Sequence, residues 1–300
     1  MSTPTPKTWL EVSLNGPWGR GRQPRIPVGV DEIVREGIAC AEAGAAIIHV
    51  HAYDEATGKP REDADLYASI IGGIRYACDA IVYPTIPVLG LSPFPKEAPA
   101  AERFATVEAL AASGLLEWAA VDPGSVNLAT YDDLREDREG FVYLNPEDHI
   151  RHALGLARKH RFHPAYAIYE PGFLRLGATL HWRCSSPAPV YRFMFSSGYT
   201  FGFPPDDYGL TAYLTLLDQV APGAQWMVGG LSVDVLPLIP RIVAEGGHVR
   251  VGLEDAPWNS QRGNVDWVME AARRIDNAGG ELAKPADVRA VLQAVEMGDV

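Results

Sequence analysis

The sequence predicts an α/β fold: a single (β/α)8 barrel, or TIM barrel, formed by residues 1–300 as one domain, with extra C-terminal helices. Three observations favour this fold. Short apolar runs typical of buried strands alternate with amphipathic runs typical of helices. Several helical runs open at Asp, Ser or Pro and close at Gly, as helix caps require. Eight strand-helix units in 300 residues also match the usual size of such a barrel.

Each element of the barrel has its own signal in the sequence. The predicted strands are short runs of mainly apolar residues, at 10–14, 46–51, 81–85, 118–122, 165–169, 191–196, 225–228 and 248–253. Helical periodicity is clearest at 31–43, 64–78, 147–159 and 233–245, and two further helices are predicted at 265–278 and 285–297. A doubly wound open sheet is the alternative fold. No Gly-x-Gly-x-x-Gly turn follows the first strand, which weighs against the dinucleotide-binding form of that alternative.

Composition excludes several classes of protein. The formal net charge of −12 argues against a nucleic-acid partner, because binding phosphates requires a basic face. No stretch approaches 18 apolar residues, and residues 1–8 lack a basic segment followed by an apolar run, so we expect neither membrane insertion nor secretion. Cys40, Cys78 and Cys184 have no metal-ligand spacing and suit reduced thiols. We therefore expect a cytoplasmic enzyme.

The barrel model can be tested on the polar residues, because catalytic groups of TIM barrels lie at the carboxyl ends of the strands. Polar side chains do occur at or just after these ends in every predicted strand except the seventh, which ends in Gly229-Gly230. They are Asn15, His49 with His51, Thr85, Asp122, Glu170, Ser196, and Glu254 with Asp255.

Two of these strands carry the composition of a metal site. His49 and His51 lie on one side of the strand at 46–51, about 7 Å apart along it. In the strand at 248–253 and the residue that follows it, Arg250 and Glu254 alternate with apolar residues, so a polar face points toward a site. The second and eighth strands of a closed barrel both neighbour the first, so the two histidines and Glu254 can meet.

Two histidines and a carboxylate leave a coordination position free, as catalytic zinc sites do. Iron, manganese or nickel can bind the same ligands, since affinity order alone does not choose the metal. Hydrogen-bonded core histidines are the alternative interpretation.

Several segments resemble the β-keto acid cleavage enzyme family, and the resemblance runs from about residue 11 to about residue 292. The matching segments are residues 42–51, 57–60, 122–127, 169–170 and 282–289, together with the highly specific string Gly-His-Val-Arg-Val-Gly-Leu-Glu-Asp at 247–255. The resemblance implies a TIM barrel that binds zinc or another divalent metal and forms a homotetramer. It implies a transferase that combines a β-keto acid with acetyl-CoA, yielding acetoacetate and a new acyl-CoA.

The resemblance also implies roles for individual residues. His49, His51 and Glu254 would be the metal ligands, while Arg250 and Asp255 would form the charged pair that begins the chemistry, with Asp255 as the base. The remaining polar residues near the barrel mouth supply the other candidates. We assign Thr85 and Glu170 to catalysis, and Asn15, Trp18, Asp122 and Ser125 to substrate binding. A barrel-floor ion pair is the alternative for Arg250 and Asp255.

The chain departs from the family pattern near the expected substrate. A family member that acts on an amino-substituted keto acid has an acidic residue shortly after the first strand, where this chain has Trp18. An indole cannot pair with an ammonium group, so we expect a β-keto acid without an amino group. The loop at 16–28 carries Arg20, Arg22 and Arg25, which could meet the pyrophosphate of CoA or a carboxylate, or could simply be solvated.

Two other functions fit the same residues. A metal-dependent aldolase or decarboxylase that acts without CoA would use the same metal ligands and carboxylate base. A non-catalytic, metal-retaining binding protein is the other alternative, and the presence of both Arg250 and Asp255 counts against it.

Overall fold

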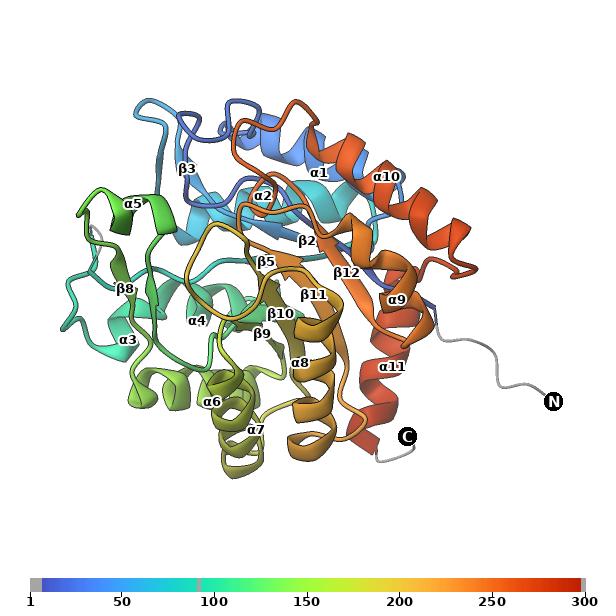
Figure 1. The fold of residues 1–300 in the computed structure, drawn as a ribbon. Helices are drawn as coiled ribbons and strands as arrows, with labels where there is room; N and C mark the ends of the chain where they lie inside the picture. Colours follow the sequence, from blue (N-terminus) through green and yellow to red (C-terminus); the bar gives the residue numbers. More distant parts are fainter. Residues whose placement is uncertain (1–6, 91–92, 298–300) are drawn as a thin grey trace.

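Eight parallel strands form a barrel in which sequence order and spatial order agree. In a computed structural model that describes residues 7–90 and 93–297, the strands follow one another around a central axis (Figure 1). They are β1 (Leu10–Ser13), β2 (Ile47–Val50), β5 (Ile81–Pro84), β6 (Trp118–Ala120), β9 (His163–Ile168), β10 (Val190–Phe195), β11 (Trp226–Gly230) and β12 (His248–Val251). Strands β5 and β6 end the hydrogen-bonded ladder and lie next to each other, so the barrel is nearly closed. The predicted fold class is confirmed.

A layer of helices surrounds the strands. Those that follow the barrel strands are α1 (Val30–Glu42), α2 (Ala64–Ala77), α4 (Ala105–Ala112), α6 (Glu147–His160), α7 (Pro171–Cys184), α8 (Asp207–Val220), α9 (Ile239–Ala244) and α10 (Asn264–Asn277). Two short helices, α3 (Ala100–Arg103) and α5 (Tyr131–Arg135), lie in connections. The last helix, α11 (Pro285–Met297), is held at the amino ends of the strands, because Arg289 bonds Asp79 and Glu117, which precede β5 and β6.

Several predicted boundaries differ by two or more residues from the observed ones, and two of these differences have a clear local cause. The helix predicted from residue 233 begins later, with a short 3-10 turn at Leu236–Leu238 followed by α9. There Asp234 Oδ1 accepts a hydrogen bond from the Leu236 N–H, 2.9 Å away, and Val233 donates instead to the backbone of Asp255. The strand predicted to reach residue 253 ends at Val251, because Gly252 adopts a φ of 133°. A Cβ at Gly252 would lie 2.2 Å from the Ser13 carbonyl oxygen, so only glycine fits this turn.

Two hairpins that periodicity did not predict extend from the strand ends. The first pairs β3 (Tyr53–Asp54) with β4 (Lys59–Pro60) just after β2. The second pairs β7 (Val126–Leu128) with β8 (Phe141–Tyr143) after β6. Both lie on the side of the barrel where the strands end, so they build up the rim around the candidate site.

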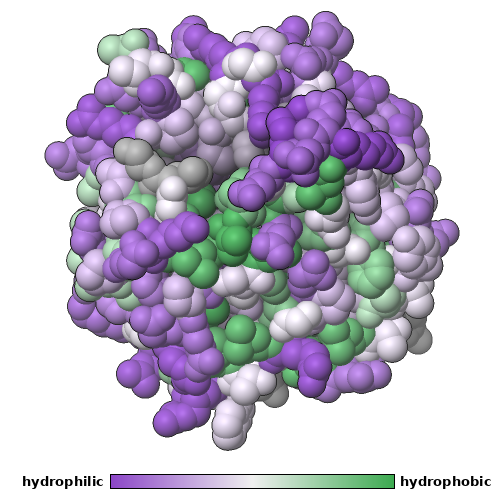
Figure 2. All heavy atoms as spheres, turned by 60° about the vertical axis from the view of Figure 1, so that its left-hand side comes forward, coloured by the Kyte–Doolittle hydropathy of each residue, from purple (hydrophilic) through white to green (hydrophobic). Residues whose placement is uncertain are grey.

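The surface on the side of the second hairpin has an apolar centre. Figure 2 brings this side forward and shows hydrophobic side chains gathered in the middle of the face, within a hydrophilic surround. On α5 and β8, the exposed large apolar residues are Tyr131, Leu134, Phe141 and Val142. Within the described residues, no helix combines the length and the apolar character needed to cross a membrane.

Candidate active site

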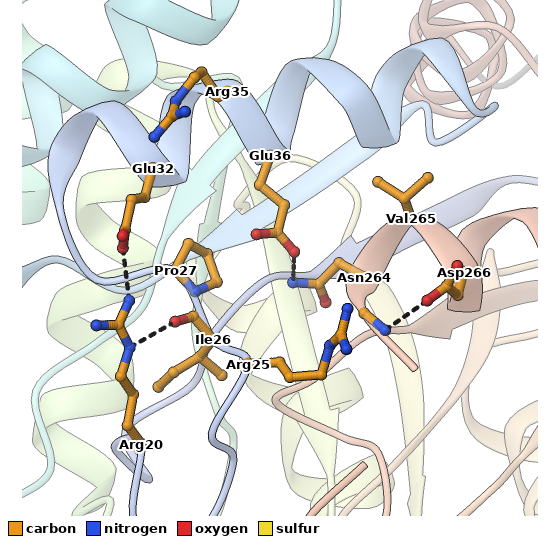
Figure 3. Close-up of a pocket in the computed structure, with 11 residues that line it drawn as sticks. Arg20, Arg25, Ile26, Pro27, Glu32, Arg35, Glu36, Asn264, Val265 and Asp266 are labelled. Carbon is orange, nitrogen blue, oxygen red and sulfur yellow. Dashed lines mark hydrogen bonds and ion pairs between the residues drawn. The ribbon is translucent and has the colours of Figure 1, made fainter. Parts of the chain in front are cut away.

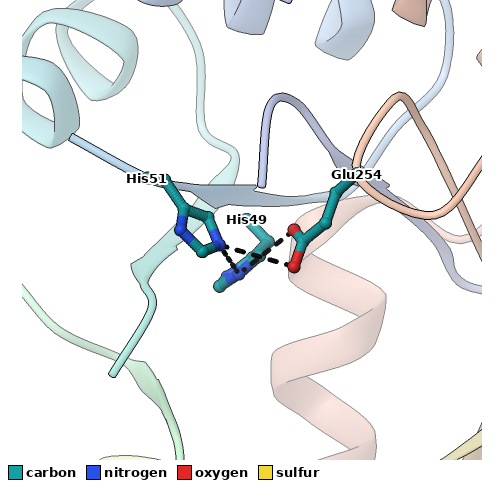
Figure 4. A group of neighbouring side chains, drawn as sticks. All are labelled: His49, His51 and Glu254. Atoms are coloured by element: carbon teal, nitrogen blue, oxygen red, sulfur yellow. Dashed lines mark hydrogen bonds and ion pairs between the residues drawn. The ribbon is translucent and has the colours of Figure 1, made fainter. Parts of the chain in front are cut away.

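His49, His51 and Glu254 meet at the carboxyl end of the barrel (Figure 4). Their strands are brought together by β1, which pairs with β2 on one side and with β12 on the other. The two histidine Nε2 atoms are 3.2 Å apart, and each lies 3.4 Å from a different carboxylate oxygen of Glu254. One ligand atom from each residue therefore faces a common point, as the sequence predicted.

Neighbouring side chains fix the two imidazoles. The Asn15 side-chain amide makes two hydrogen bonds with the His51 backbone. Its Oδ1 accepts from the His51 N–H at 2.9 Å, and its Nδ2 donates to the His51 carbonyl at 3.0 Å. The Tyr83 ring packs against His49, with ring centroids 4.7 Å apart. Asn15 is not among the residues that line the cavity, so its observed contact is with the backbone of His51.

The spacing of these donors fits a metal ion. Two ligands about 2.0–2.1 Å from one tetrahedral ion stand about 3.3 Å apart, close to the 3.2 Å that separates the two Nε2 atoms. Burial lowers the pKa of His49 well below its usual range, so this imidazole is neutral and able to coordinate. Burial acts to raise the pKa of Glu254, but Arg250 and the two histidines lower it well below its usual range, so the carboxylate is ionised.

The charge of the barrel interior also favours a cation. Two buried cations, Arg192 and Arg250, lie there. The buried or nearly buried carboxyl groups are those of Glu11, Asp122, Glu254 and Asp255. When all four carboxyl groups are ionised, two negative charges have no partner, and a buried uncompensated charge is costly. A divalent cation would neutralise both.

Arg250 and Asp255 form a two-pronged ion pair beside this cluster. Arg250 Nε and Nη2 each donate to one Asp255 oxygen at 2.8 Å, and both residues are buried. Arg250 Nη2 also lies 3.1 Å from Glu254 Oε2, which links the pair to the histidines. Burial raises the pKa of Asp255 above its ordinary value, although Arg250 acts to lower it. A carboxylate with a raised pKa is a stronger proton acceptor.

The turn at Gly252 explains why Glu254 and Asp255 can both face the barrel interior. Consecutive residues of a strand point to opposite sides. Here the strand has ended, and the Asp255 and Ala256 N–H groups both donate to the Gly252 carbonyl, at 3.2 and 2.9 Å. The turn therefore directs two neighbouring carboxylates to the same site.

A cavity of about 380 Å³ opens over the cluster. Its lining includes seven of the residues predicted for the site, namely Trp18, His49, His51, Thr85, Asp122, Arg250 and Glu254. Much of the remaining wall is apolar or aromatic, including Ile86, Leu128, Phe141, Tyr169 and Met194. The Trp18 indole Nε1 donates to the Glu254 carbonyl at 3.0 Å, which holds the ring against the metal-ligand cluster. Asp122 is buried between the Tyr143 hydroxyl and the Ala167 N–H.

Four predicted site residues are outside the cavity lining. Asn15 bonds the His51 backbone and Asp255 is paired with Arg250, whereas the other two bond loop backbone. The exposed Ser125 accepts a hydrogen bond from the Asn145 N–H at 2.8 Å and does not line the cavity. Glu170 is the residue before α7, and its carboxylate accepts from the Gly202 N–H at 3.2 Å, again outside the cavity lining. Both follow a strand end, but the local turn directs their side chains toward loop backbone.

The three arginines of the loop at 16–28 line two different cavities. Arg22 lines the active-site cavity, with its guanidinium 5.7 Å from the ring centre of Trp18 and 5.5 Å from that of Trp258. Arg20 and Arg25 line a different cavity, of about 520 Å³, between this loop, α1 and α10 (Figure 3). There Arg20 pairs with Glu32 at 2.7 Å, and Glu36 accepts from Asn264.

Sequence reasoning missed Arg192 and Glu11. Both are charged residues inside otherwise apolar strands, β10 and β1, and that interruption was the signal that could have found them. Glu11 Oε1 accepts from the Tyr83 hydroxyl at 2.6 Å and from Arg250 Nη1 at 3.2 Å, and it lies 3.4 Å from Arg192 Nη1. The floor of the site is thus a network that joins four strands of the barrel, β1, β5, β10 and β12.

The fold and the site together define a TIM-barrel enzyme with a candidate metal centre next to a buried arginine-aspartate pair. The chain belongs to the beta-keto acid cleavage enzyme family, whose model matches residues 7–293. This finding confirms the resemblance seen in the sequence.

Relatives with known activities are similar over nearly the whole chain. The 3-keto-5-aminohexanoate cleavage enzyme of Fusobacterium nucleatum is 24% identical, covering 90% of this chain and 91% of the relative. The 3-dehydrocarnitine:acetyl-CoA trimethylamine transferase of Rhizobium meliloti is 25% identical, with coverage of 89% and 90%. The 3-oxoadipate:acetyl-CoA acetyltransferase of Cupriavidus necator is also 25% identical, with coverage of 94% and 93%.

Solved structures share the fold. The apo structure of ObcA superposes with a TM-score of 0.71 at 15% identity, covering 91% of this chain and 66% of the ObcA chain. An HMG-CoA lyase in complex with coenzyme A and 3-methylmalate gives a TM-score of 0.56 at 9% identity, with coverage of 98% and 92%.

Proposed function

We propose that this enzyme is a zinc-dependent β-keto acid cleavage enzyme that uses acetyl-CoA and releases acetoacetate and a new acyl-CoA. The observation that carries the proposal is the combination of the His49, His51 and Glu254 cluster with the adjacent Arg250–Asp255 pair, in a chain of this family. The names of its relatives add support, because several specify acetyl-CoA as co-substrate.

The proposed chemistry assigns one role to each group. Zinc held by His49, His51 and Glu254 would act as a Lewis acid toward the keto acid. Asp255 accepts a proton from the carbon between the keto and carboxylate groups, and Arg250 holds the Asp255 carboxylate in place. That carbon then attacks the acetyl carbon, and CoA leaves as a thiolate. The thiolate adds to the original ketone carbon, the bond between that carbon and the attacking carbon breaks, and Asp255 returns its proton to the departing acetoacetate.

Isotope labelling tests the reaction directly. The metal-loaded protein is incubated with a panel of β-keto acids and acetyl-CoA that carries ¹³C in its acetyl group. We expect acetoacetate that contains the labelled acetyl carbons and an acyl-CoA that contains the chain of the keto acid. Loss of the keto acid without acetyl-CoA would instead indicate a decarboxylase or aldolase. No turnover across the panel, with metal bound, would favour a binding protein.

We further propose a substrate without an amino group, because Trp18 stands in the cavity wall beside the metal cluster and much of the remaining wall is apolar or aromatic. Burying an ammonium there without an anion costs several kcal/mol, whereas an alkyl chain gains about 25 cal/mol per Å² of buried apolar surface. We expect kcat/KM for an alkyl β-keto acid to exceed that for an amino-substituted acid of equal length by about tenfold or more. A tenfold preference for the amino substrate would show that another group receives the amine.

The cytoplasmic location and the homotetramer are proposals that rest on the sequence and the family resemblance. Light scattering of the purified protein measures the oligomeric state. Arg22, at the mouth of the cavity, is our candidate contact for an anionic part of CoA, because it lines the cavity and has no carboxylate within ion-pair distance among the described residues.

A further inference from the structure

Arg192 is a buried arginine in the wall of the active-site cavity. It lies on β10, is 4% exposed and lines the cavity together with Arg250 and His49. Its register partner on β11 is Met227, but the residues that border its side chain include two small ones. Ala167 is its partner on β9, and a Cβ at Gly229 on β11 would meet the Arg192 Cδ at 3.2 Å. The barrel therefore leaves space for this side chain beside the Arg250–Asp255 pair.

The guanidinium of Arg192 has one occupied side and one free edge. Its Nη1 donates to the Tyr83 hydroxyl at 2.9 Å and lies 3.4 Å from Glu11 Oε1. Its Nε is buried without any hydrogen-bond partner, and within residues 7–90 and 93–297 its Nη2 also makes no hydrogen bond. Nε and Nη2 form one of the edges with which arginine binds a carboxylate through two parallel hydrogen bonds.

Arg250 differs from Arg192 in this respect. Its Nε and Nη2 are engaged by Asp255, and its Nη1 is engaged by Glu11. All three nitrogens of Arg250 are therefore committed to protein carboxylates. Of the two guanidinium groups in the floor of the site, Arg192 is the one that has donors left for a ligand.

The charge of Arg192 is also incompletely balanced. Glu11 Oε1 is shared among Arg192, Arg250 and the Tyr83 hydroxyl, and Arg192 has the longest of these contacts. Asp122, another carboxyl group in the lining, already accepts from Tyr143 and from the Ala167 N–H. The only ion pair of Arg192 among the described residues is therefore this shared one. Once a divalent cation balances the two surplus carboxylates, an anionic ligand at the free edge of Arg192 would be stabilised by charge-assisted hydrogen bonds.

The position of this edge relates it to the candidate metal centre. The Tyr83 hydroxyl contacts Arg192, and the ring of the same tyrosine packs on the metal-ligand candidate His49. One phenol ring thus separates the guanidinium from the metal-ligand cluster. In a β-keto acid, only one carbon lies between the ketone carbon and the carboxylate. A keto oxygen at the cluster would therefore place the acid's own carboxylate near Arg192.

We infer that Arg192 binds the carboxylate of the β-keto acid and thereby selects acids over neutral ketones, a role that rests on the proposed function. The test measures the affinity of two probes, acetoacetate and acetoacetamide, by calorimetry on protein of known metal content. The probes share the keto group and differ in the charge of one end. The variants are Arg192→Met, which removes the charge; Arg192→Lys, which keeps the charge but loses the fork; and the control Arg241→Met on α9, outside the cavity.

We expect wild-type protein and the Arg241→Met control to prefer acetoacetate over acetoacetamide by about thirtyfold or more, as a buried charge-assisted pair would provide. In Arg192→Met the preference should fall below about threefold, with Arg192→Lys between the two. The metal content should not change in any variant. Should Arg192→Met fail to fold, Arg192→Lys decides the question by its reduced preference for acetoacetate over acetoacetamide.

Other results would overturn the inference. If Arg192→Met weakens the binding of acetoacetate and acetoacetamide equally, Arg192 has only a structural role. If acetoacetate binding is unchanged but 3-oxoadipate binding weakens, Arg192 binds a second, distant carboxylate instead. Wild-type protein that neither binds acetoacetate nor produces it would overturn the proposed function together with this inference. Wild-type protein that binds acetoacetate, with an unchanged preference in the variant, would overturn the inference alone.

Discussion

His51→Ala is expected to remove the bound metal and, with it, all measurable turnover. His51 Nε2 is one of three ligand atoms that face a common point, 3.2 Å from His49 Nε2 and 3.4 Å from Glu254. Removing one of three protein donors leaves too few to hold the ion, and the metal-binding energy that supports the site is lost with it. Elemental analysis should show about one divalent ion per chain in wild-type protein and less than about 0.2 in the variant.

A matched histidine separates this effect from general damage. His152 lies on α6, packed near Phe104 and outside the cavity lining, so His152→Ala should keep its metal and its activity. The thermal unfolding of both variants is recorded alongside, because the cluster of His49 and Glu254 left by His51→Ala is buried. Full metal occupancy in His51→Ala would contradict the assignment of these ligands. It would favour the alternative that both histidines are hydrogen-bonded core residues.

Asp255→Asn should abolish turnover while the metal stays bound. Asparagine keeps the shape of the side chain but cannot accept the proton, and a positioned general base contributes about 10²- to 10⁴-fold to a rate. We expect kcat to fall by about that factor with the metal content unchanged. Arg250→Lys should be severely impaired as well, because an ammonium group cannot make the two 2.8 Å bonds that orient Asp255.

The control for Asp255→Asn is Asp234→Asn, which changes an aspartate that caps the turn before α9 and does not line the cavity. It should keep nearly full activity. A nearly normal rate for Asp255→Asn would mean that another carboxylate is the base. Glu170 is the next candidate from the sequence, but Asp122 lines the cavity and Glu170 does not. Asp122→Asn would then be the variant to measure.

Much of the fold could be predicted from local patterns. Short apolar runs identified the eight barrel strands, and the order of strands in a closed barrel allowed His49, His51 and Glu254 to meet. The errors also have local causes. The late start of α9 follows from the Asp234 cap, and the early end of β12 follows from the positive φ of Gly252. Neither feature changes the apolar periodicity that indicated these elements.

The site was harder to predict where a loop sets the direction of a side chain. Asn15, Ser125 and Glu170 follow strand ends as expected, yet each side chain is engaged by backbone and does not line the cavity. Trp18 is in a loop without periodicity, and its hydrogen bond to the Glu254 carbonyl holds it at the cavity wall. Position along a strand predicts which end of the barrel a residue occupies, but the turn after the strand sets where its side chain points.

By itself, the sequence determined the barrel, the family and the pairing of the second and eighth strands through the first, because each depends on patterns within a few residues or on strand order. The tertiary structure alone decided that Glu254 and Asp255 both turn inward and that Arg192 reaches Glu11 and Tyr83 across the barrel. The physical reason is distance along the chain. The contacts of Arg192 join residues more than a hundred positions apart, and the stagger of a closed barrel, which no local periodicity encodes, sets which side chains share a layer. The turn at Gly252 is short in sequence, but it packs against the Ser13 backbone of a distant strand.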